Sequence, residues 1–414
     1  MIVMKGVLAI LLSALFVVNS ALAENSISFL ISPQYSGYSS DTLFDLPDEF
    51  IEKPKATSQQ IIELTGSYPN QFINLGYLFS LHNQLSSHSP SATSVKTNEL
   101  YLSKSLNEWE LTFGRRISSW GVGYGFRPLD LVQQYDQQTL SRQSTIGKNM
   151  LALERFSGMS SWSLLWVNPN QSDESENRDI ESIVSKYSTS QDDYDLHAVF
   201  RYNELNRLQL GLGAITILSD QVAIHGSLLL SQRYQKQLHQ LAGQSTVLLA
   251  ERFPYETVDY HRGTQALIGI NWSSSSKHNL IAEYWYDQQA YSRQQWRELF
   301  ELAKNQQKLL NQSAISPALI QGNIAWSAMA TQAQALSQHN LMLRWSYDAD
   351  HWKPSANILI SAADKSSMIT LSTTRSTHLF KFEAGIRTFN GANNSVYGGL
   401  IVSNILFLTL SGEY

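Results

Sequence analysis

The chain has 414 residues and a formal net charge of −5, and only 16% of its residues are charged. So mild a charge argues against nucleic acid or another polyanion as a partner. The sequence contains no cysteine, which excludes disulfides, thiolate metal sites and lipid attachment through cysteine.

The first segment, residues 1–23, has the pattern of a secretory signal peptide. Lys5 precedes an apolar run at 6–18, and the small-residue site Ala21-Leu22-Ala23 stands before Glu24. The remainder, 24–414, has no apolar stretch of the length that a membrane-spanning helix needs, and no linker divides it. We therefore expect a cleaved signal peptide followed by one exported domain over 24–414.

Apolar and polar residues alternate in many segments after the signal peptide, as they do in strands with two different faces. One row of each segment is apolar, for example Ile73 to Leu81, Tyr194 to Tyr202, Leu208 to Ala214, Ala266 to Trp272, Leu341 to Tyr347 and Phe380 to Ile386. Several segments are about ten residues long, the length of a tilted transmembrane strand, and short polar links join them. This pattern predicts an all-β fold, a transmembrane antiparallel up-and-down β-barrel of about 16 strands (14–18).

The most unusual local sequence covers residues 114–130. Glycines alternate at 121, 123 and 125, which predicts an extended strand whose bare face admits another backbone or an inward-folded loop. Arg115, Arg116 and Arg127 bracket it, and a turn is expected from Arg127 to Asp130. Two interpretations stay open: a constriction that filters solutes by charge and size, or a packed wall whose arginines are satisfied by carboxylates.

Three connections are long, at 127–148, 168–193 and 288–336, and the first follows the glycine-rich segment. In barrels the long connections are extracellular. The third contains a predicted helix: Ser292 and Gln295 form a capping-box pattern before an apolar stripe of Trp296, Leu299, Phe300 and Ala303. The helix can cap the mouth, fold into the pore or pack on the rim, and we favour the rim. It is open whether residues 244–251 form a strand. If they do not, the up or down direction of the neighbouring strands is reversed.

The last nine residues alternate again, with Leu406, Leu408, Leu410 and Tyr414 opposite Thr409, Ser411 and Glu413. This segment resembles the terminal strand of bacterial outer-membrane β-barrels, and we expect it to pair with the region around Ile27. Residues 114–130 are similar to a glycine-rich strand-to-loop region of porin-like outer-membrane proteins of Gram-negative bacteria. The resemblance implies location in the cell outer membrane, contact with outer-membrane lipid, and Tyr414 as an assembly signal for the barrel-assembly machinery.

The resemblance also implies a passive channel for small solutes. Pore-lining candidates are the charged residues of the glycine-rich segment and of the inward strand rows, namely Arg115, Arg116, Arg127, Asp130, Arg201, Glu283, Arg344, Lys381, Glu383 and Arg387. Because both signs of charge occur on these rows, they predict an ion-pair network or a transverse field, and no strong ion selectivity.

An outer-membrane enzyme is an alternative class. The sequence has no Gly-x-Ser-x-Gly elbow, no His-Glu-x-x-His and no phosphate-binding glycine loop, and His197 and His225 are isolated. No group of residues has metal-ligand spacing. We therefore expect no catalytic residue, metal or cofactor. A barrel enzyme acting on lipids and an export or structural barrel remain as alternatives, and the oligomeric state is open.

Overall fold

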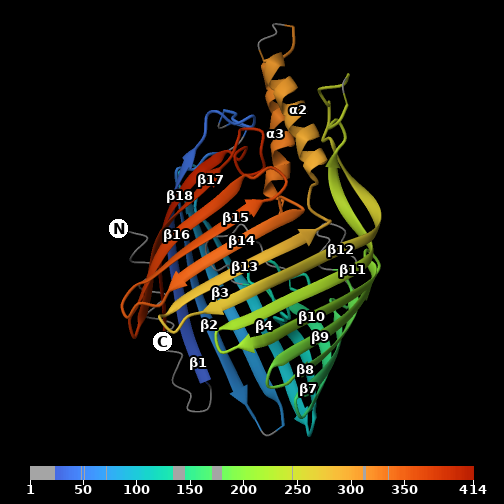
Figure 1. Cartoon of the computed structure of the whole chain (residues 1–414), viewed down its shortest axis with the longest axis vertical. Helices are drawn as coiled ribbons and strands as arrows, with labels where there is room; N and C mark the ends of the chain where they lie inside the picture. The colour runs from blue at the N-terminus through green and yellow to red at the C-terminus, as the bar shows by residue number, and fades with distance from the viewer. Residues whose placement is uncertain are drawn as a thin grey trace.

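A computed structural model describes residues 24–47, 49–50, 52–70, 72–133, 145–169, 180–244, 246–310, 314–333 and 335–414. These residues form one sheet of 18 strands, closed into a ring (Figure 1). Every strand pairs antiparallel with its neighbours in sequence, and β1 pairs with β18. The up-and-down antiparallel barrel is confirmed, with 18 strands where the sequence indicated about 16. The predicted signal peptide lies outside the described residues.

The strands have the following bounds: β1 (Glu24–Tyr38), β2 (Ala56–Pro69), β3 (Asn74–Ser86), β4 (Ala92–Leu106), β5 (Trp109–Arg116), β6 (Lys148–Ser157), β7 (Ser160–Val167), β8 (Ser182–Ser190), β9 (Tyr194–Asn203), β10 (Arg207–Ser219), β11 (Val222–His239), β12 (Tyr255–Ser273), β13 (His278–Asp287), β14 (His339–Tyr347), β15 (Lys353–Ser361), β16 (Ser367–Ser376), β17 (Phe380–Asn390) and β18 (Val402–Glu413). The connection between β13 and β14 carries helix α2 (Arg293–Leu309), helix α3 (Pro317–Ala328) and the 3₁₀ turn η1 (Met329–Gln332).

The ring closes through the last residues of the chain. β18 runs antiparallel to β1, with Ile31 opposite Leu410 and Ser28 opposite Glu413. The backbones of Ile27 and Tyr414 exchange two hydrogen bonds of 2.9 Å. The predicted pairing of the terminal strand with the Ile27 region is confirmed, and it removes the open sheet edges.

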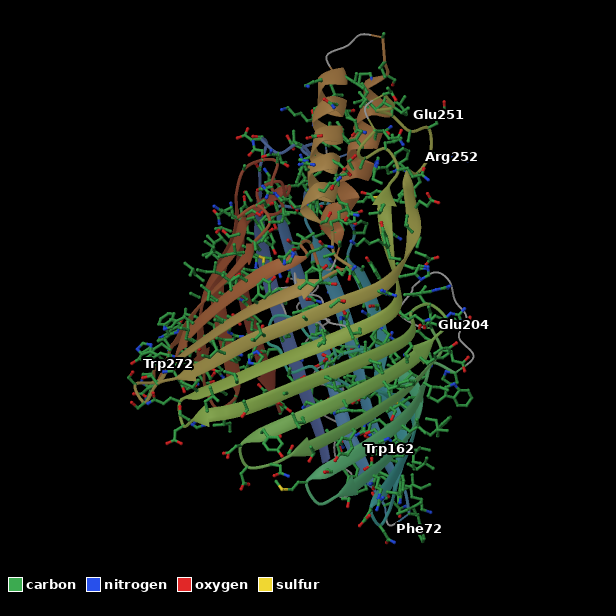
Figure 2. All side chains as sticks on the ribbon, turned by 45° about the vertical axis from the view of Figure 1, so that its right-hand side comes forward. Phe72, Trp162, Glu204, Glu251, Arg252 and Trp272 are labelled. Atoms are coloured by element: carbon green, nitrogen blue, oxygen red, sulfur yellow. The ribbon has the colours of Figure 1, made fainter. Side chains whose placement is uncertain are left out.

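The barrel wall has an apolar outside. On β10, β11 and β12 the outward rows expose large apolar side chains such as Leu212 and Ile268, whereas Gln209 and Ser227 of the inward rows are buried. Trp162, Trp272 and Phe72 lie toward the end with the short turns, and Glu204, Glu251 and Arg252 lie toward the other end (Figure 2). An apolar exterior with aromatic residues near its border fits contact with lipid.

The long connections all lie at one end of the barrel, as expected. They join β1 to β2, β5 to β6, β7 to β8, β11 to β12, β13 to β14 and β17 to β18, whereas the strands are joined at the other end by turns of a few residues. β1 begins and β18 ends at the short-turn end. Helices α2 and α3 stand side by side above the long-loop end (Figure 1). Among the described residues, no helix is both long and apolar enough to cross a membrane.

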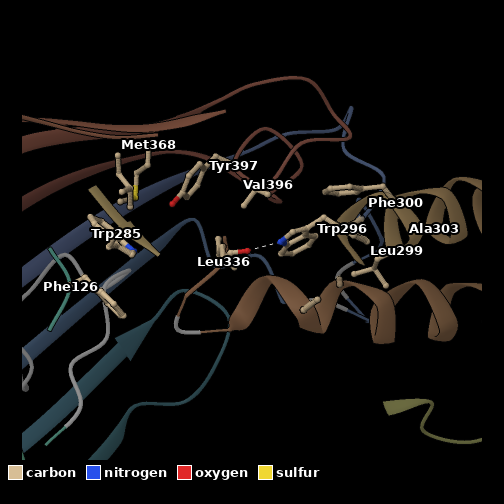
Figure 3. Packing of buried hydrophobic residues seen from close by; sticks show 14 of the residues in the cluster. Phe126, Trp285, Trp296, Leu299, Phe300, Ala303, Leu336, Met368, Val396 and Tyr397 are labelled. Atoms are coloured by element: carbon tan, nitrogen blue, oxygen red, sulfur yellow. Dashed lines mark hydrogen bonds between the residues drawn. The ribbon is translucent and has the colours of Figure 1, made fainter. Parts of the chain in front are cut away.

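Helix α2 is the predicted helix. The Ser292 hydroxyl accepts from the Gln295 amide, the Gln295 side chain accepts from the Ser292 amide, and Trp296, Leu299, Phe300 and Ala303 are buried. The indole of Trp296 donates to the carbonyl of Leu336 (Figure 3). Helix α3 was not predicted, because apolar residues surround it and it lacks a one-sided stripe. It packs against α2, so the connection forms a helical hairpin.

Two local predictions are wrong, and the strand left open at 244–251 is decided. β8 lies inside the predicted connection 168–193, because its Ser-rich sequence hides the alternation while β7 and β9 pair with it along its length. The glycine-rich strand ends early: β5 stops at Arg116, and residues 117–133 leave the wall. The described part of 244–251 contains no strand. Instead β11 and β12 continue beyond their neighbours.

Beyond the rim, β11 and β12 form a two-stranded ribbon. β10 pairs with β11 up to Ser231, and β13 pairs with β12 up to Gln265. Residues 233–239 and 255–261 pair with each other past these points and rise beside the helical hairpin (Figure 1). Contacts such as the hydrogen bond from the Tyr291 hydroxyl to the Gln237 carbonyl join this β11–β12 ribbon to the segment leading into α2.

Candidate functional site

The connection between β5 and β6 enters the barrel. Residues 117–133, here called the lumenal loop, contact β4 through a hydrogen bond from the Ile117 amide to Glu99 and contact the inner wall from β6 to β14. Leu129 of this loop is fully buried, and a Cβ added to Gly211 or Gly213 of β10 would lie 2.5 or 2.7 Å from its methyl groups. The two wall glycines therefore make room for Leu129. The glycine-rich segment was expected to admit an inward loop, but it is itself that loop.

Glu283 of β13 binds the middle of the lumenal loop. Its carboxylate accepts hydrogen bonds of 2.7 Å from the backbone amides of Tyr124 and Gly125. Its Oε1 also lies 2.7 Å from Nε2 of His225 on β11, and both side chains are buried. A carboxylate that accepts several donors is held firmly, because hydrogen bonds to an ionised group are stronger than neutral ones.

Asp130 stabilises the loop from within. Its buried carboxylate accepts from the Ser119 hydroxyl at 2.9 Å, from the Gly121 amide at 2.6 Å and from the Trp120 amide. The predicted turn is present, since the Asp130 amide donates to the Arg127 carbonyl. Arg127 Nε donates to the Gly123 carbonyl at 2.8 Å, and a guanidinium nitrogen lies 3.9 Å from Asp130.

A cavity of about 840 Å³ lies between the lumenal loop, the barrel wall and the underside of the helical hairpin. The loop contributes Tyr124 to Asp130, the wall contributes Trp285 and Met342, and η1 contributes Met329. Phe126 stacks on Trp285 with 5.8 Å between ring centroids, beside the cluster that continues up to the hairpin (Figure 3). The cavity therefore occupies the long-loop half of the lumen.

Cations outnumber acids around this cavity. Among the described residues that line it, the cationic ones are Arg127, Arg201, Lys236, Arg344 and Arg387, and the acidic ones are Asp130 and Asp287. Both acids already accept hydrogen bonds from the protein: Asp287 from Gln265 and the Gln289 amide, and Asp130 as described above. The residues that line the cavity therefore include more cations than acids.

Three of these cations are buried: Arg201, Lys236 and Arg387. Arg201 on β9 is 7% exposed, and no described residue accepts a hydrogen bond from its Nε. Lys236 lies on the β11–β12 ribbon, where its ammonium is 3.4 Å from Gln295 of α2 and sits over the rings of Tyr234 and Tyr260. Burial lowers the pKa of Lys236 to about 8.

The structure brings together six of the ten pore-lining candidates. Arg127, Asp130, Arg201, Arg344 and Arg387 line the cavity, and Glu283 lies at its edge under the loop. Arg387 also donates to Thr370 of the neighbouring strand at 2.9 Å.

The other four candidates lie elsewhere. Arg115 is in the row of exposed Phe113 and bonds to Asn149 and the Thr97 carbonyl. Arg116 forms a separate group in the wall, with Glu154 at 3.3 Å and Glu110 at 3.7 Å. Lys381 and Glu383 lie on β17 near the short turn that joins it to β16.

Sequence reasoning missed Lys236 and Trp285 as cavity residues. Lys236 follows the last alternating residue of β11, in the polar run 232–237, so no periodicity places it on a strand. Trp285 is on the inward row of β13 between Glu283 and Asp287, and that position was the available signal. In the described part of the chain, no group of three or more His, Asp or Glu side chains could hold a metal ion.

No protein-family model matches this chain, and no curated protein matches its sequence. Solved structures do resemble it. Pseudomonas aeruginosa OccK11 (OpdR) superposes with a TM-score of 0.55 and 9% identity, over 94% of this chain and 95% of that chain. Pseudomonas aeruginosa OccK5 (OpdH) gives 0.54 and 8% over 94% and 97%.

A triple mutant of Rhodopseudomonas blastica porin also matches, with a TM-score of 0.44 and 10% identity over 95% of this chain and 100% of that chain. At identities this low, the likeness to the two Pseudomonas structures concerns the fold, which they share over nearly their whole length. In its fold the chain is a porin-like β-barrel.

Proposed function

We propose that this protein is a channel of the outer membrane through which small solutes pass passively. One observation carries the proposal: a closed ring of 18 strands has an apolar outside and encloses a cavity lined by charged and polar side chains. A barrel of this strand number is wide enough for an aqueous lumen, and the lumenal loop narrows it. The cavity under the helical hairpin would be the first site that a solute meets from the long-loop side.

The charges around the cavity add a preference. The strand rows taken together carry both signs, which predicted no strong selectivity, but the fold gathers five cations around one cavity and leaves two acids that are already bonded. A narrow passage between low-dielectric walls concentrates ions of the opposite sign. We therefore propose that small anions pass more readily than cations.

Conductance across a planar lipid bilayer tests the channel. Purified, folded protein is expected to produce stable open-channel steps in KCl. The absence of steps, together with release of fatty acid from lipid micelles, would favour the barrel enzyme. If neither open-channel steps nor fatty acid release is observed, the result would favour an export or structural barrel.

Replacement of Arg201 or Arg344 by Gln tests the preference for anions. Each variant is expected to lower the permeability ratio of chloride to potassium, because each removes a cation of the cavity. Arg155→Gln is the matched control, since Arg155 pairs with Glu108 at the short-turn end of β6, away from the cavity. Equal selectivity in all these variants would show that the cavity does not control ion passage.

A further inference from the structure

Two charged side chains of the wall bind the backbone of the lumenal loop: Glu99 of β4 accepts from the amide of its first residue, Ile117, at 2.7 Å, and Glu283 binds the middle of the loop. The side chain of Glu283 is fully buried. Its carboxylate accepts hydrogen bonds from two backbone amides of the loop and faces His225. The ring of Tyr124 packs edge-on against the His225 ring, with 5.6 Å between centroids. One carboxylate therefore connects β13, β11 and the loop at a single point.

The surrounding glycines leave space for this contact. A Cβ on Gly269 of β12 would lie 2.3 Å from Nε2 of His225 and 2.8 Å from Cγ of Glu283. A Cβ on Gly125 would lie 2.7 Å from Sδ of Met342 and 3.2 Å from Oε2 of Glu283. A larger residue at position 269 would force His225 and Glu283 to shift, and one at position 125 would force Met342 and Trp285 to shift and would crowd the carboxylate.

Beside Glu99 and a hydrogen bond of 3.3 Å from Asn271 of β12 to the Tyr124 hydroxyl, the loop has contacts that are apolar or internal to it. Phe126 stacks on Trp285, and Leu129 fills the space above Gly211 and Gly213. These apolar contacts favour burial but have little directional preference. Asp130 bonds to residues of its own loop, so it stabilises the shape of the loop and does not fix it to the wall.

We propose that Glu283 is the positioning residue of the channel: by binding the Tyr124 and Gly125 amides it holds the lumenal loop against the wall and sets the width of the passage. The effect on the width of the passage rests on the proposed channel function, whereas the contact between Glu283 and the loop does not. Because the loop carries Arg127 and borders the cavity, its release would change both the size and the charge of the passage.

Glu283→Gln is the first test. Glutamine keeps the shape of the side chain, but its amide nitrogen is a donor and would face another donor, so at least one of the three contacts is lost. We expect a larger or noisier open-channel conductance than in the unmodified protein. Glu63→Gln is the matched control, because Glu63 lies on β2, outside the arc of wall that the loop contacts.

Gly125→Ala perturbs the same contact from the loop side, and it decides the question if Glu283→Gln fails to fold. We expect the same change in conductance from it. Gly322→Ala in α3 serves as its control, since a Cβ there meets no atom within 4 Å.

A second readout does not depend on conductance. The chain has no cysteine, so Leu129→Cys places a single thiol at a buried position of the loop. In micelles of folded protein, adding Glu283→Gln should raise the rate of thiol labelling about tenfold or more, as expected for lost hydrogen bonds to an ionised group. Adding Glu63→Gln should leave the rate unchanged.

The outcomes separate the two proposals. Faster labelling with Glu283→Gln supports the positioning role even if no variant conducts, in which case the channel function fails alone. Unchanged labelling and unchanged conductance in folded Glu283→Gln and Gly125→Ala would overturn the positioning role and leave the channel function standing.

Discussion

At the scale of single residues, Lys236 predicts a pH dependence. Its pKa is about 8 because it is buried, so the ammonium loses its proton as the pH rises from 7 to 9. The titratable groups packed around it are Tyr234, Tyr260 and Asp287. Burial raises the pKa of Tyr234 above its usual value of 10.0, so Tyr234 remains neutral over this interval.

We therefore expect the preference for chloride over potassium to fall between pH 7 and pH 9, as the cavity loses one positive charge. Measurements of the zero-current potential at several pH values check this. Lys236→Gln should have a lower preference that no longer varies over the interval, and Lys236→Arg should keep the high preference at pH 9. An unaltered pH response in Lys236→Gln would assign the titration to another group.

The contact between Leu129 and the wall glycines gives a second prediction. Gly211→Ala places a methyl group 2.5 Å from Leu129, so the loop must shift and the conductance should change. Leu129→Ala removes the obstructing side chain, and the double variant should return toward the unmodified conductance. Effects that simply add in the double variant would show that the two residues do not act through this contact.

Residues on regular strands could be placed from the sequence, and residues outside them could not. Arg201, Arg344 and Arg387 lie on the expected inward rows because side chains alternate along a strand. Arg115 differs because it lies on the outward row of β5. Its position beside the glycines did not indicate which face of the strand it occupies. Lys236 lies on the β11–β12 ribbon, whose polar sequence does not alternate.

At the scale of elements, the capping box of α2 predicts that loss of the N-cap side chain destabilises α2 more than α3. Ser292→Ala removes the hydroxyl that accepts from the Gln295 amide, which should destabilise the hairpin by about 1 kcal/mol. Faster amide hydrogen exchange in α2 measures this. Ser316→Ala is the control, because the N-cap of α3 makes no side-chain hydrogen bond. Equal effects of the two substitutions would contradict a specific role for the cap.

The sequence identified α2 because two independent signals agree there, the cap and the apolar stripe. It did not identify α3, because the apolar residues of this helix do not fall on one side, although its buried residues are confined to Ile320, Asn323, Ile324, Ser327 and Ala328. β8 was missed for a similar reason: pairing with two neighbours, which no local pattern records, holds a Ser-rich segment in the sheet.

At the scale of the whole molecule, closure depends on the last strand. Tyr414 bonds to the Ile27 backbone, and its ring lies 6.4 Å from Phe29 and 6.3 Å from Phe380. Deletion of Tyr414 should therefore lower the yield of folded protein in the outer membrane, measured by the shift in gel mobility on heating. Tyr414→Phe keeps the ring and the backbone bonds and should assemble normally. Normal assembly of the protein that lacks Tyr414 would show that Tyr414 is not an assembly signal.

The barrel itself was predictable because one period is repeated along most of the chain, and errors in single strands leave the closed ring intact. The interior was not predictable to the same degree. The path of the lumenal loop depends on Glu283, Gly211 and Gly213, which are far from it in sequence and show no local sign of the contact. The cationic cavity exists only once these distant segments meet.

We propose that this lumen conducts and that its cavity favours anions. The zero-current potential of the unmodified protein in a planar bilayer, under a roughly tenfold KCl gradient at pH 7, tests both parts together. We predict stable channels whose zero-current potential has the sign of a membrane more permeable to chloride than to potassium. Folded protein that conducts no current, or that conducts potassium in preference to chloride, would contradict it.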